Sequence, residues 1–254
     1  MLVDVHAHLD FEGLRERLDE VIANAKNAGV KSIITSGVNP ETNRIALEIV
    51  NKYPDIVHAS WGLYPIDALE REGLIGKPID VDSEIEFLKK NKDKFISVGE
   101  VGLDLHSGKD LARQKEAFSK VLDAAKKVNK TVLVHSRKAE SEAIDMLESH
   151  GMKKVVMHCF TAKKSLVKRA YDLGYYFSIP PVIVRLQQFQ DMADFVDINH
   201  ILTETDAPFL SPFKDKRNEP AFVVETINKI AEIKKMDKIE VINNIWMNYQ
   251  KLFL

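Results

Sequence analysis

The chain has 254 residues, of which 45% are hydrophobic and 29% are charged, and its formal net charge at pH 7 is −2. This composition excludes a disordered or fibrous protein, and the near-neutral charge excludes a global positive field that would attract nucleic acid. Cys159 is the only cysteine, which excludes an intrachain disulfide. There is no run of about 18 apolar residues, and Met1 leads directly into an expected strand, so a soluble, cytoplasmic protein without a signal peptide is expected.

Eight short apolar segments have the length and alternation of β-strands, and segments of helical periodicity separate them. The chain opens with the first strand, in which Leu2, Val3 and Val5 alternate with polar residues. The strands are expected to end at His8, Ser36, Trp61, Glu100, His135, His158, Ser178 and Glu204. Helices are expected at residues 13–29, from 39 onward, and at 82–90, 110–128, 139–149, 163–173 and 186–195, with two more within 220–254. A longer connection that carries Pro and Gly is expected over 63–78.

The spacing of these segments predicts the fold class. Each interval between successive strand ends is about long enough for a loop, a helix and the return to the next strand. Eight such units in one chain close most naturally as an α/β protein of the (β/α)8 TIM-barrel type, with an open doubly wound sheet as the alternative. No low-complexity linker or charge block interrupts the chain, so one domain over residues 1–254 is expected.

Side chains suited to metal binding stand at the expected strand ends, where parallel barrels gather their functional residues. His6 and His8 are two residues apart and therefore share one face of their strand, although two hydrogen-bonded histidines without metal are the alternative for such a pair. Four imidazoles and two carboxylates on one rim match borderline divalent ions. Six ligands exceed the needs of one tetrahedral ion, so two ions bridged by Glu100 are expected. The candidate ligands are His6, His8, Glu100, His135, His158 and Asp206.

The other metal-binding residue types fall at less suggestive positions. Four histidines are expected to be structural or surface residues: His58, His106, His150 and His200. Cys159 follows His158 and could act as a soft ligand, but adjacent side chains at a strand end diverge. We therefore expect Cys159 to be a small buried hydrophobe.

Six short motifs occur in a fixed order along the chain: DVHAHLD (4–10), GEVGLD (99–104), LVHSRKA (133–139), MHCF (157–160), ETDAPFLSP (204–212) and KRNEPAFV (216–223). Together they resemble the TatD-type metal-dependent deoxyribonucleases, a branch of the amidohydrolase-like barrels. The resemblance implies hydrolysis of phosphodiester bonds in DNA, single-stranded or at frayed ends, with two divalent metal ions. By position, it implies that His6, His8 and Asp206 hold one ion. It assigns His135 and His158 to the other, with Glu100 as the bridge.

The resemblance also implies roles around these ligands. Glu204 is expected to orient ligands without binding metal. Asp104 is expected either to fix the loop after Glu100 or to cap its turn. Arg137 and Arg217 are expected to hold phosphate through their planar guanidinium groups, although a surface salt bridge to Glu219 or another acid is the alternative for Arg217.

The chain departs from the family pattern after the third strand. The family commonly has Gly-x-His-Pro there, whereas this chain has Gly62, Leu63, Tyr64 and Pro65. We expect Tyr64 to face the substrate and either to stack on a base or to donate to a phosphate oxygen. Packing against the 63–78 connection or stacking on Trp61 is the alternative.

The expected activity is therefore that of a two-metal hydrolase in which Asp206 accepts a proton from the attacking water. Imidazole-rich coordination favours zinc, manganese or nickel, while carboxylate and phosphate oxygens also admit magnesium. Hydrolysis of an amide, a lactone or an aminoacyl ester on the same metals is the nearest alternative. Related barrels with those activities often bridge their metals with a carbamylated lysine, so Glu100 favours a nuclease. A non-catalytic metal- or nucleic-acid-binding protein is the third possibility.

Overall fold

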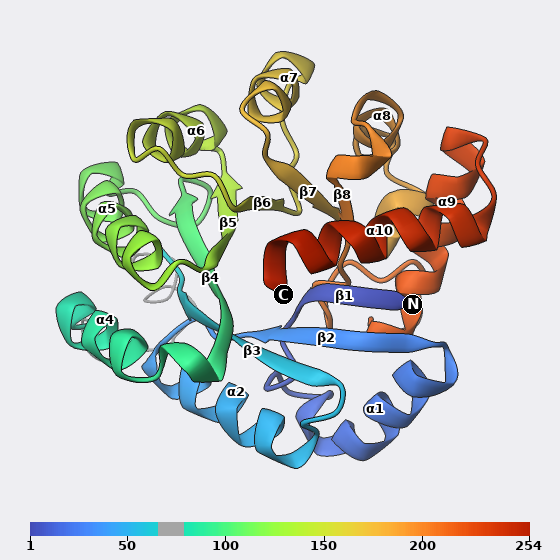
Figure 1. The fold of residues 1–254 in the computed structure, drawn as a ribbon, viewed down its shortest axis with the longest axis horizontal. Coiled ribbons are helices and arrows are strands. Elements are labelled where there is room, and N and C mark those ends of the chain that lie inside the picture. The colour runs from blue at the N-terminus through green and yellow to red at the C-terminus, as the bar shows by residue number, and fades with distance from the viewer. Residues whose placement is uncertain (66–78) are drawn as a thin grey trace. The chain divides into compact units, whose positions relative to one another are not determined.

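The computed structural model describes residues 1–65 and 79–254. Within them, strands and helices alternate along the chain, and the strands follow one another in the sheet in chain order (Figure 1). The strands are β1 (Leu2–Ala7), β2 (Val30–Ser36), β3 (Val57–Leu63), β4 (Phe95–Asp104), β5 (Thr131–Arg137), β6 (Val155–His158), β7 (Tyr176–Ile179) and β8 (Ile201–Thr203). This is the topology of a (β/α)8 barrel, and the predicted fold class is confirmed.

The helices fall close to the segments that periodicity predicts. They are α1 (Leu18–Asn27), α2 (Pro40–Lys52), α4 (Val81–Lys90), α5 (Leu111–Val128), α6 (Glu140–Ser149), α7 (Lys164–Asp172), α8 (Gln187–Phe195), α9 (Val223–Lys234) and α10 (Lys238–Phe253). Among the residues that the structure describes, no helix is long and apolar enough to cross a membrane. The predicted connection over 63–78 lies outside the described residues except at its first three positions.

The first helix begins later than predicted. Residues 15–17 form a 3-10 turn, and α1 starts at Leu18 instead of residue 13. Gly13 has a φ of 86°, a left-handed conformation that cannot belong to a right-handed helix. The Glu16 carboxylate accepts a hydrogen bond from the Gly13 amide, which stabilises a local turn in place of the first helical turn.

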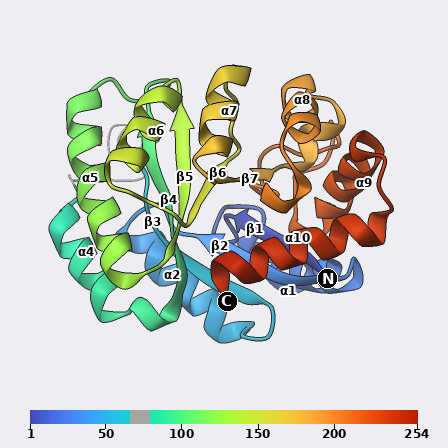
Figure 2. The same ribbon diagram turned by 45° about the horizontal axis from the view of Figure 1, so that its top comes forward.

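The described chain divides into two compact units. The first unit comprises residues 1–35, 48–58 and 176–254, and the second comprises 36–47 and 59–175. In the first unit, β1 pairs with β2 and β7 pairs with β8, both in parallel. Helix α10 packs against β1 and β8, and Figure 2 shows it beside β1. Asn248 of that helix donates to the carbonyls of Ile198 and Ile201.

In the second unit, β3, β4, β5 and β6 pair in parallel, and α5 and α6 cover the outer side of β4 and β5 (Figure 1). The buried face of α5 carries Phe118, Val121 and Leu122, as the sequence predicts. Strand β4 runs to Asp104, four residues beyond the predicted end at Glu100. It continues because Val101 and Leu103 are apolar and pair with β5, after a register shift between Val98 and Val101 that surrounds Glu100.

Candidate metal centre

The end of β1 and the loop after β8 bring His6, His8 and Asp206 together; we call these three residues the first cluster. The Nε2 atoms of His6 and His8 lie 3.2 Å apart. Oδ1 of Asp206 lies 3.5 Å from Nε2 of His6 and 3.4 Å from Nε2 of His8. The side chain of His6 is fully buried, whereas those of His8 and Asp206 are 10% and 15% exposed. One side of the cluster therefore opens to solvent.

The distances in the first cluster fit a shared cation better than direct hydrogen bonds. Three atoms separated by 3.2–3.5 Å are far apart for charge-assisted hydrogen bonds, which span about 2.7–2.9 Å. A tetrahedral ion with ligand bonds of about 2.0–2.1 Å holds its ligand atoms about 3.4 Å from one another. Two imidazoles and one carboxylate are also a donor set that suits zinc and similar divalent ions.

A buried carboxylate ties the two segments of the first cluster to each other. Asp4 on β1 accepts hydrogen bonds from the amides of His6 (3.2 Å) and Thr205 (2.9 Å), and from the Thr205 hydroxyl (2.5 Å). The Asp206 amide in turn donates to the His6 carbonyl over 2.9 Å. Burial raises the pKa of the Asp4 carboxyl to about 7, against the lowering effect of the hydrogen bonds from Thr205 and His6.

Asn218 stabilises the loop that carries Asp206 through hydrogen bonds to its backbone. The Asn218 side-chain amide donates to the carbonyls of Thr205 (2.7 Å) and Phe209 (2.6 Å), and its backbone amide donates to Pro208. Asp206 has a φ of 54°, so this loop keeps a non-glycine residue in the left-handed region. Sequence analysis missed Asp4, Thr205 and Asn218 as supporting residues. The signals were present: Asp4 is a charge inside an apolar strand, and Asn218 lies in the KRNEPAFV motif.

Glu204 is fully buried at the end of β8. Its Oε2 accepts a hydrogen bond of 2.6 Å from the Ser178 hydroxyl on β7. The peptide amide of Glu204 donates to the Ile179 carbonyl. Glu204 thereby joins the ends of β7 and β8 just before the loop that carries Asp206. Its predicted role in orienting ligands stays a prediction.

The second cluster consists of Glu100 on β4, His135 on β5 and His158 at the end of β6. Oε1 of Glu100 lies 2.7 Å from Nδ1 of His135 and 3.6 Å from Nε2 of His158. Glu100 and His158 are buried, and the His135 side chain is 14% exposed. Cys159, next to His158, is partly exposed and has a φ of 44°, so the expectation of a buried cysteine is wrong. Strand β6 ends at His158, and Cys159 lies in the turn that follows, where its side chain is partly exposed.

The β4 backbone is packed tightly around Glu100. A Cβ atom added to Gly62 at the end of β3 would lie 2.6 Å from the Glu100 amide nitrogen and closer still to the Gly37 carbonyl oxygen. Asn43 holds Gly62 with two hydrogen bonds of 2.8 Å, one donated and one accepted. Only glycine fits at position 62, because any side chain would displace the segment that carries Glu100.

Asp104 is the second carboxylate that contacts His135. Its Oδ2 lies 3.2 Å from Nε2 of His135, while its Oδ1 accepts from the amides of His106 and Ser107. Gln114 of α5 exchanges two further hydrogen bonds with the Asp104 backbone. One carboxylate oxygen therefore caps the turn after β4, and the other faces His135. The role of Asp104 at the site stays a prediction.

The two carboxylates hold the second cluster in a charged state when no ion is bound. Burial lowers the pKa of His135, but hydrogen bonds to Asp104 and Glu100 outweigh burial and raise it to about 9. Burial raises the pKa of Asp104, but the hydrogen bond from His135 outweighs it, and the net pKa lies well below its ordinary value. Because an imidazole binds metal in its neutral form, an ion at His135 has to displace a proton.

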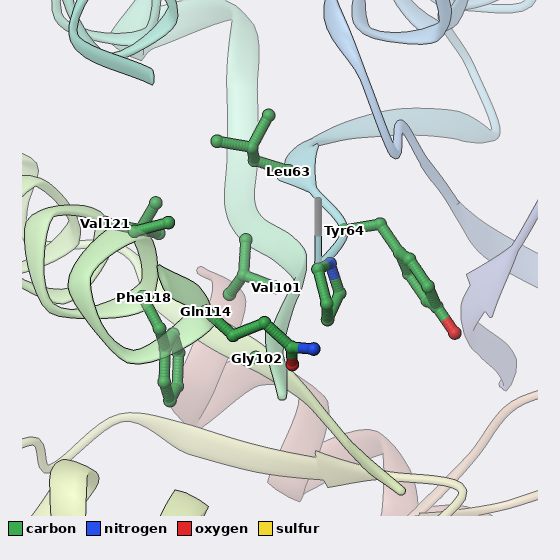
Figure 3. A pocket seen from close by; sticks show the side chains of 9 residues that line it. Leu63, Tyr64, Val101, Gly102, Gln114, Phe118 and Val121 are labelled. Atoms are coloured by element: carbon green, nitrogen blue, oxygen red, sulfur yellow. The ribbon is translucent and has the colours of Figure 1, made fainter. Parts of the chain in front are cut away.

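Tyr64 lies beside the second cluster. Its hydroxyl donates to Oδ2 of Asp104 over 2.9 Å and lies 3.2 Å from Nε2 of His135. The Tyr64 and His135 ring centroids are 4.8 Å apart. Figure 3 shows the Tyr64 ring pointing away from Phe118 and Val121, which line an apolar pocket behind it. The ring is therefore directed to the polar cluster, and its contact with a substrate stays a prediction.

The two arginines expected to hold phosphate differ in their surroundings. Arg137, the last residue of β5, is exposed. Arg217 is also exposed, and its Nη1 donates to the Glu12 carbonyl over 2.6 Å, next to Gly13. Glu219 pairs with Arg17 and Asn24 and not with Arg217, whereas a salt bridge of Arg217 to another acid stays an open alternative.

The chain is similar in sequence and structure to known proteins. Residues 3–254 match the family model described as TatD related DNase. The uncharacterized metal-dependent hydrolase YabD of Bacillus subtilis is 32% identical, over 100% of this chain and 99% of its own length. Human deoxyribonuclease TATDN3 is 31% identical, over 99% of this chain and 94% of its own length. The crystal structure of YJJV, a TatD homolog from Escherichia coli, matches this chain with a TM-score of 0.89 and 26% sequence identity. The match covers 99% of this chain and 97% of YJJV.

Proposed function

The chain belongs to the TatD-related DNase family of metal-dependent hydrolases, and from that premise we propose that it is a two-metal deoxyribonuclease. The proposed substrate is a phosphodiester bond in single-stranded DNA or at the frayed end of a duplex. The observation that carries the proposal is the convergence of His6, His8 and Asp206 at 3.2–3.5 Å on a solvent-facing side. The name of the human relative, a deoxyribonuclease, supports DNA as the substrate.

We assign one ion to His6, His8 and Asp206 and the other to His135 and His158, with Glu100 as a ligand of both. In a (β/α)8 topology the carboxyl ends of all strands lie on one face. The candidate ligands come from the second half of their strands or from the residues just after them. The donor chemistry supports zinc or manganese over magnesium, since nitrogen ligands outnumber carboxylates. We also propose that residues 1–254 act as one domain, because each compact unit supplies only part of the ligand set.

When bound, the divalent ions lower the pKa of the attacking water and polarise a phosphoryl oxygen. Asp206 is the residue proposed to accept the proton of that water. It is the most exposed member of the first cluster, and the Asp4–Thr205 contacts hold its loop against β1. Asp104 holds the His135 ring in one orientation, and Glu204 fixes the base of the Asp206 loop. Arg137 and Arg217 are proposed to bind the phosphates on either side of the cleaved bond.

The experiment is metal reconstitution with a panel of substrates. Protein stripped of metal is loaded with zinc, manganese, nickel or magnesium and assayed on single-stranded DNA, duplex DNA, a generic phosphodiester and carboxylic esters. We expect two ions per chain by titration and elemental analysis, and fastest cleavage of single-stranded DNA. Asp206→Asn serves as the inactive control. Binding that saturates at one ion would overturn the bridged pair, and preference for an ester would overturn the nuclease.

The proposed compartment is the cytoplasm. Cys159 is the single cysteine, so the chain cannot form an intrachain disulfide, and this is compatible with a reducing environment.

A further inference from the structure

Two exposed phenylalanines stand next to the first cluster. Phe11 is 37% exposed and Phe209 is 46% exposed, and their ring centroids are 5.1 Å apart in an edge-to-face arrangement. The Phe209 centroid also lies 6.4 Å from the His8 ring. Single exposed apolar residues are common on protein surfaces, but a contiguous aromatic pair beside a polar site is typical of a binding surface.

Both phenylalanines lie in hydrogen-bonded turns, one starting at His8 and the other at Asp206, which are candidate metal ligands. The Phe11 amide donates to the His8 carbonyl over 3.1 Å, and the Phe209 amide donates to the Asp206 carbonyl over 2.9 Å. Each ring is thus three residues after a ligand, in a hydrogen-bonded turn. Asn218 fixes the second turn further through its bond to the Phe209 carbonyl. The rings are held by the same segments that position the cluster.

Cationic residues occur on the segment that follows Phe209, and one of them bonds to the residue next to Phe11. Arg217 donates to the carbonyl of Glu12, the residue directly after Phe11. The loop that follows Phe209 carries exposed Lys214 and Lys216 against one acid, Asp215. An occupant of this surface therefore has flat apolar faces for the rings and negative charge for the lysines and arginine. A nucleic acid strand with unpaired bases has both.

We propose that Phe11 and Phe209 form a stacking platform for an unpaired base of the DNA strand, adjacent to the bond that is cleaved. This inference rests on the proposed function and adds the residues that select the strand. A paired base is stacked on both faces within a duplex, so it cannot offer a face to the rings. Base–aromatic stacking accepts any base, because every base has a π-face. The platform therefore selects unpaired strands without selecting sequence.

The test compares two oligonucleotides, one intact and one with a tetrahydrofuran residue in place of a single nucleoside near the end. Binding is measured by fluorescence anisotropy with the metal-loaded protein and oligonucleotides that carry phosphorothioate linkages, so that cleavage is suppressed. Wild-type protein is expected to bind the intact strand about tenfold to a hundredfold more tightly than the strand that lacks the base. Phe209→Ala is expected to bind both strands equally, and Phe209→Trp is expected to restore the preference. Met247→Ala removes a similarly exposed side chain (47%) from α10 and should behave as wild type.

Several outcomes separate this inference from the proposed function. If wild type cleaves DNA but Phe209→Ala keeps the preference for the intact strand, the platform is wrong and the nuclease stands. If Phe209→Ala loses bound metal as well as affinity, Phe209 supports the ligands and is no binding residue. If wild type sediments as a dimer that Phe209→Ala dissociates, the surface binds a second copy of the chain instead. If wild type neither binds nor cleaves DNA, both proposals fall.

Discussion

The hydroxyl of Tyr64 donates a hydrogen bond of 2.9 Å to Oδ2 of Asp104. A hydroxyl carries one proton, so this donation leaves none for a phosphate oxygen. This chain has a phenol at position 64 whose proton is directed to a carboxylate inside the protein. Of the two substrate roles predicted for Tyr64, stacking remains compatible with this bond, whereas donation to phosphate requires that it break.

Tyr64→Phe is therefore expected to lower the free energy of unfolding by about 1.5–3 kcal/mol, the range for a hydrogen bond to a charged group. Urea denaturation of the metal-free protein measures the change. Tyr53→Phe is the matched control, because Tyr53 donates to the carboxylate of Asp19, which is exposed to water. Its unfolding midpoint should stay at the wild-type value. Equal losses in the two variants would mean that the Tyr64 bond contributes no more than a surface contact.

Glu100→Ala is expected to reduce turnover by more than about a hundredfold, beyond the 10- to 100-fold cost of losing a residue that only supports a ligand. The reason is that Glu100 contacts both His135 and His158. Elemental analysis should show less bound metal, while circular dichroism should show an intact fold. His58→Ala is the control, because His58 is the second residue of β3 and lies near the strand end opposite to Leu63. Equal loss of activity in the two folded variants would refute the proposed ligand set.

Stability should fall below about pH 6.5 partly because of His58. Burial lowers the pKa of His58 in the folded protein, so the unfolded chain binds its proton first as the pH falls. The stabilising contribution is present above the unfolded pKa and is lost as the pH drops through the folded pKa, at no more than about 1.4 kcal/mol per pH unit. Unfolding of wild type and His58→Gln between pH 8 and 5 measures the difference. Parallel curves would show that His58 keeps its ordinary pKa.

Arg137→Ala is expected to weaken binding of single-stranded DNA and to reduce the slope of log K against log salt by about 0.7, the value for one phosphate contact. Arg217→Lys should keep the slope, because the charge is retained. Lys26→Ala removes an exposed cation that pairs with Asp55 and should leave both quantities unchanged. An unchanged slope in Arg137→Ala would remove Arg137 from the phosphate contacts.

Much of the fold was readable from local patterns. The helix at α5 follows from its apolar face, and β6 ends at His158 as predicted, because hydrophobic periodicity is a property of adjacent residues. The predicted boundaries of β4 and α1 are wrong because strand pairing or backbone conformation there outweighs the hydrophobic pattern. Strand β4 passes Glu100 because β5 pairs with Val101 and Leu103, and α1 starts late because Gly13 is left-handed. Neither the pairing partner nor a positive φ is visible in periodicity.

By itself, the sequence predicted the candidate ligands and which of them share a face of a strand, because a strand's alternation sets which side chains point the same way. Only the tertiary structure decided which groups support them. Asp4 bonds to Thr205, 201 positions away, and Tyr64 bonds to Asp104, 40 positions away. Contacts between distant segments depend on how the strands are brought together in the fold, and no local pattern encodes the distance between two such side chains.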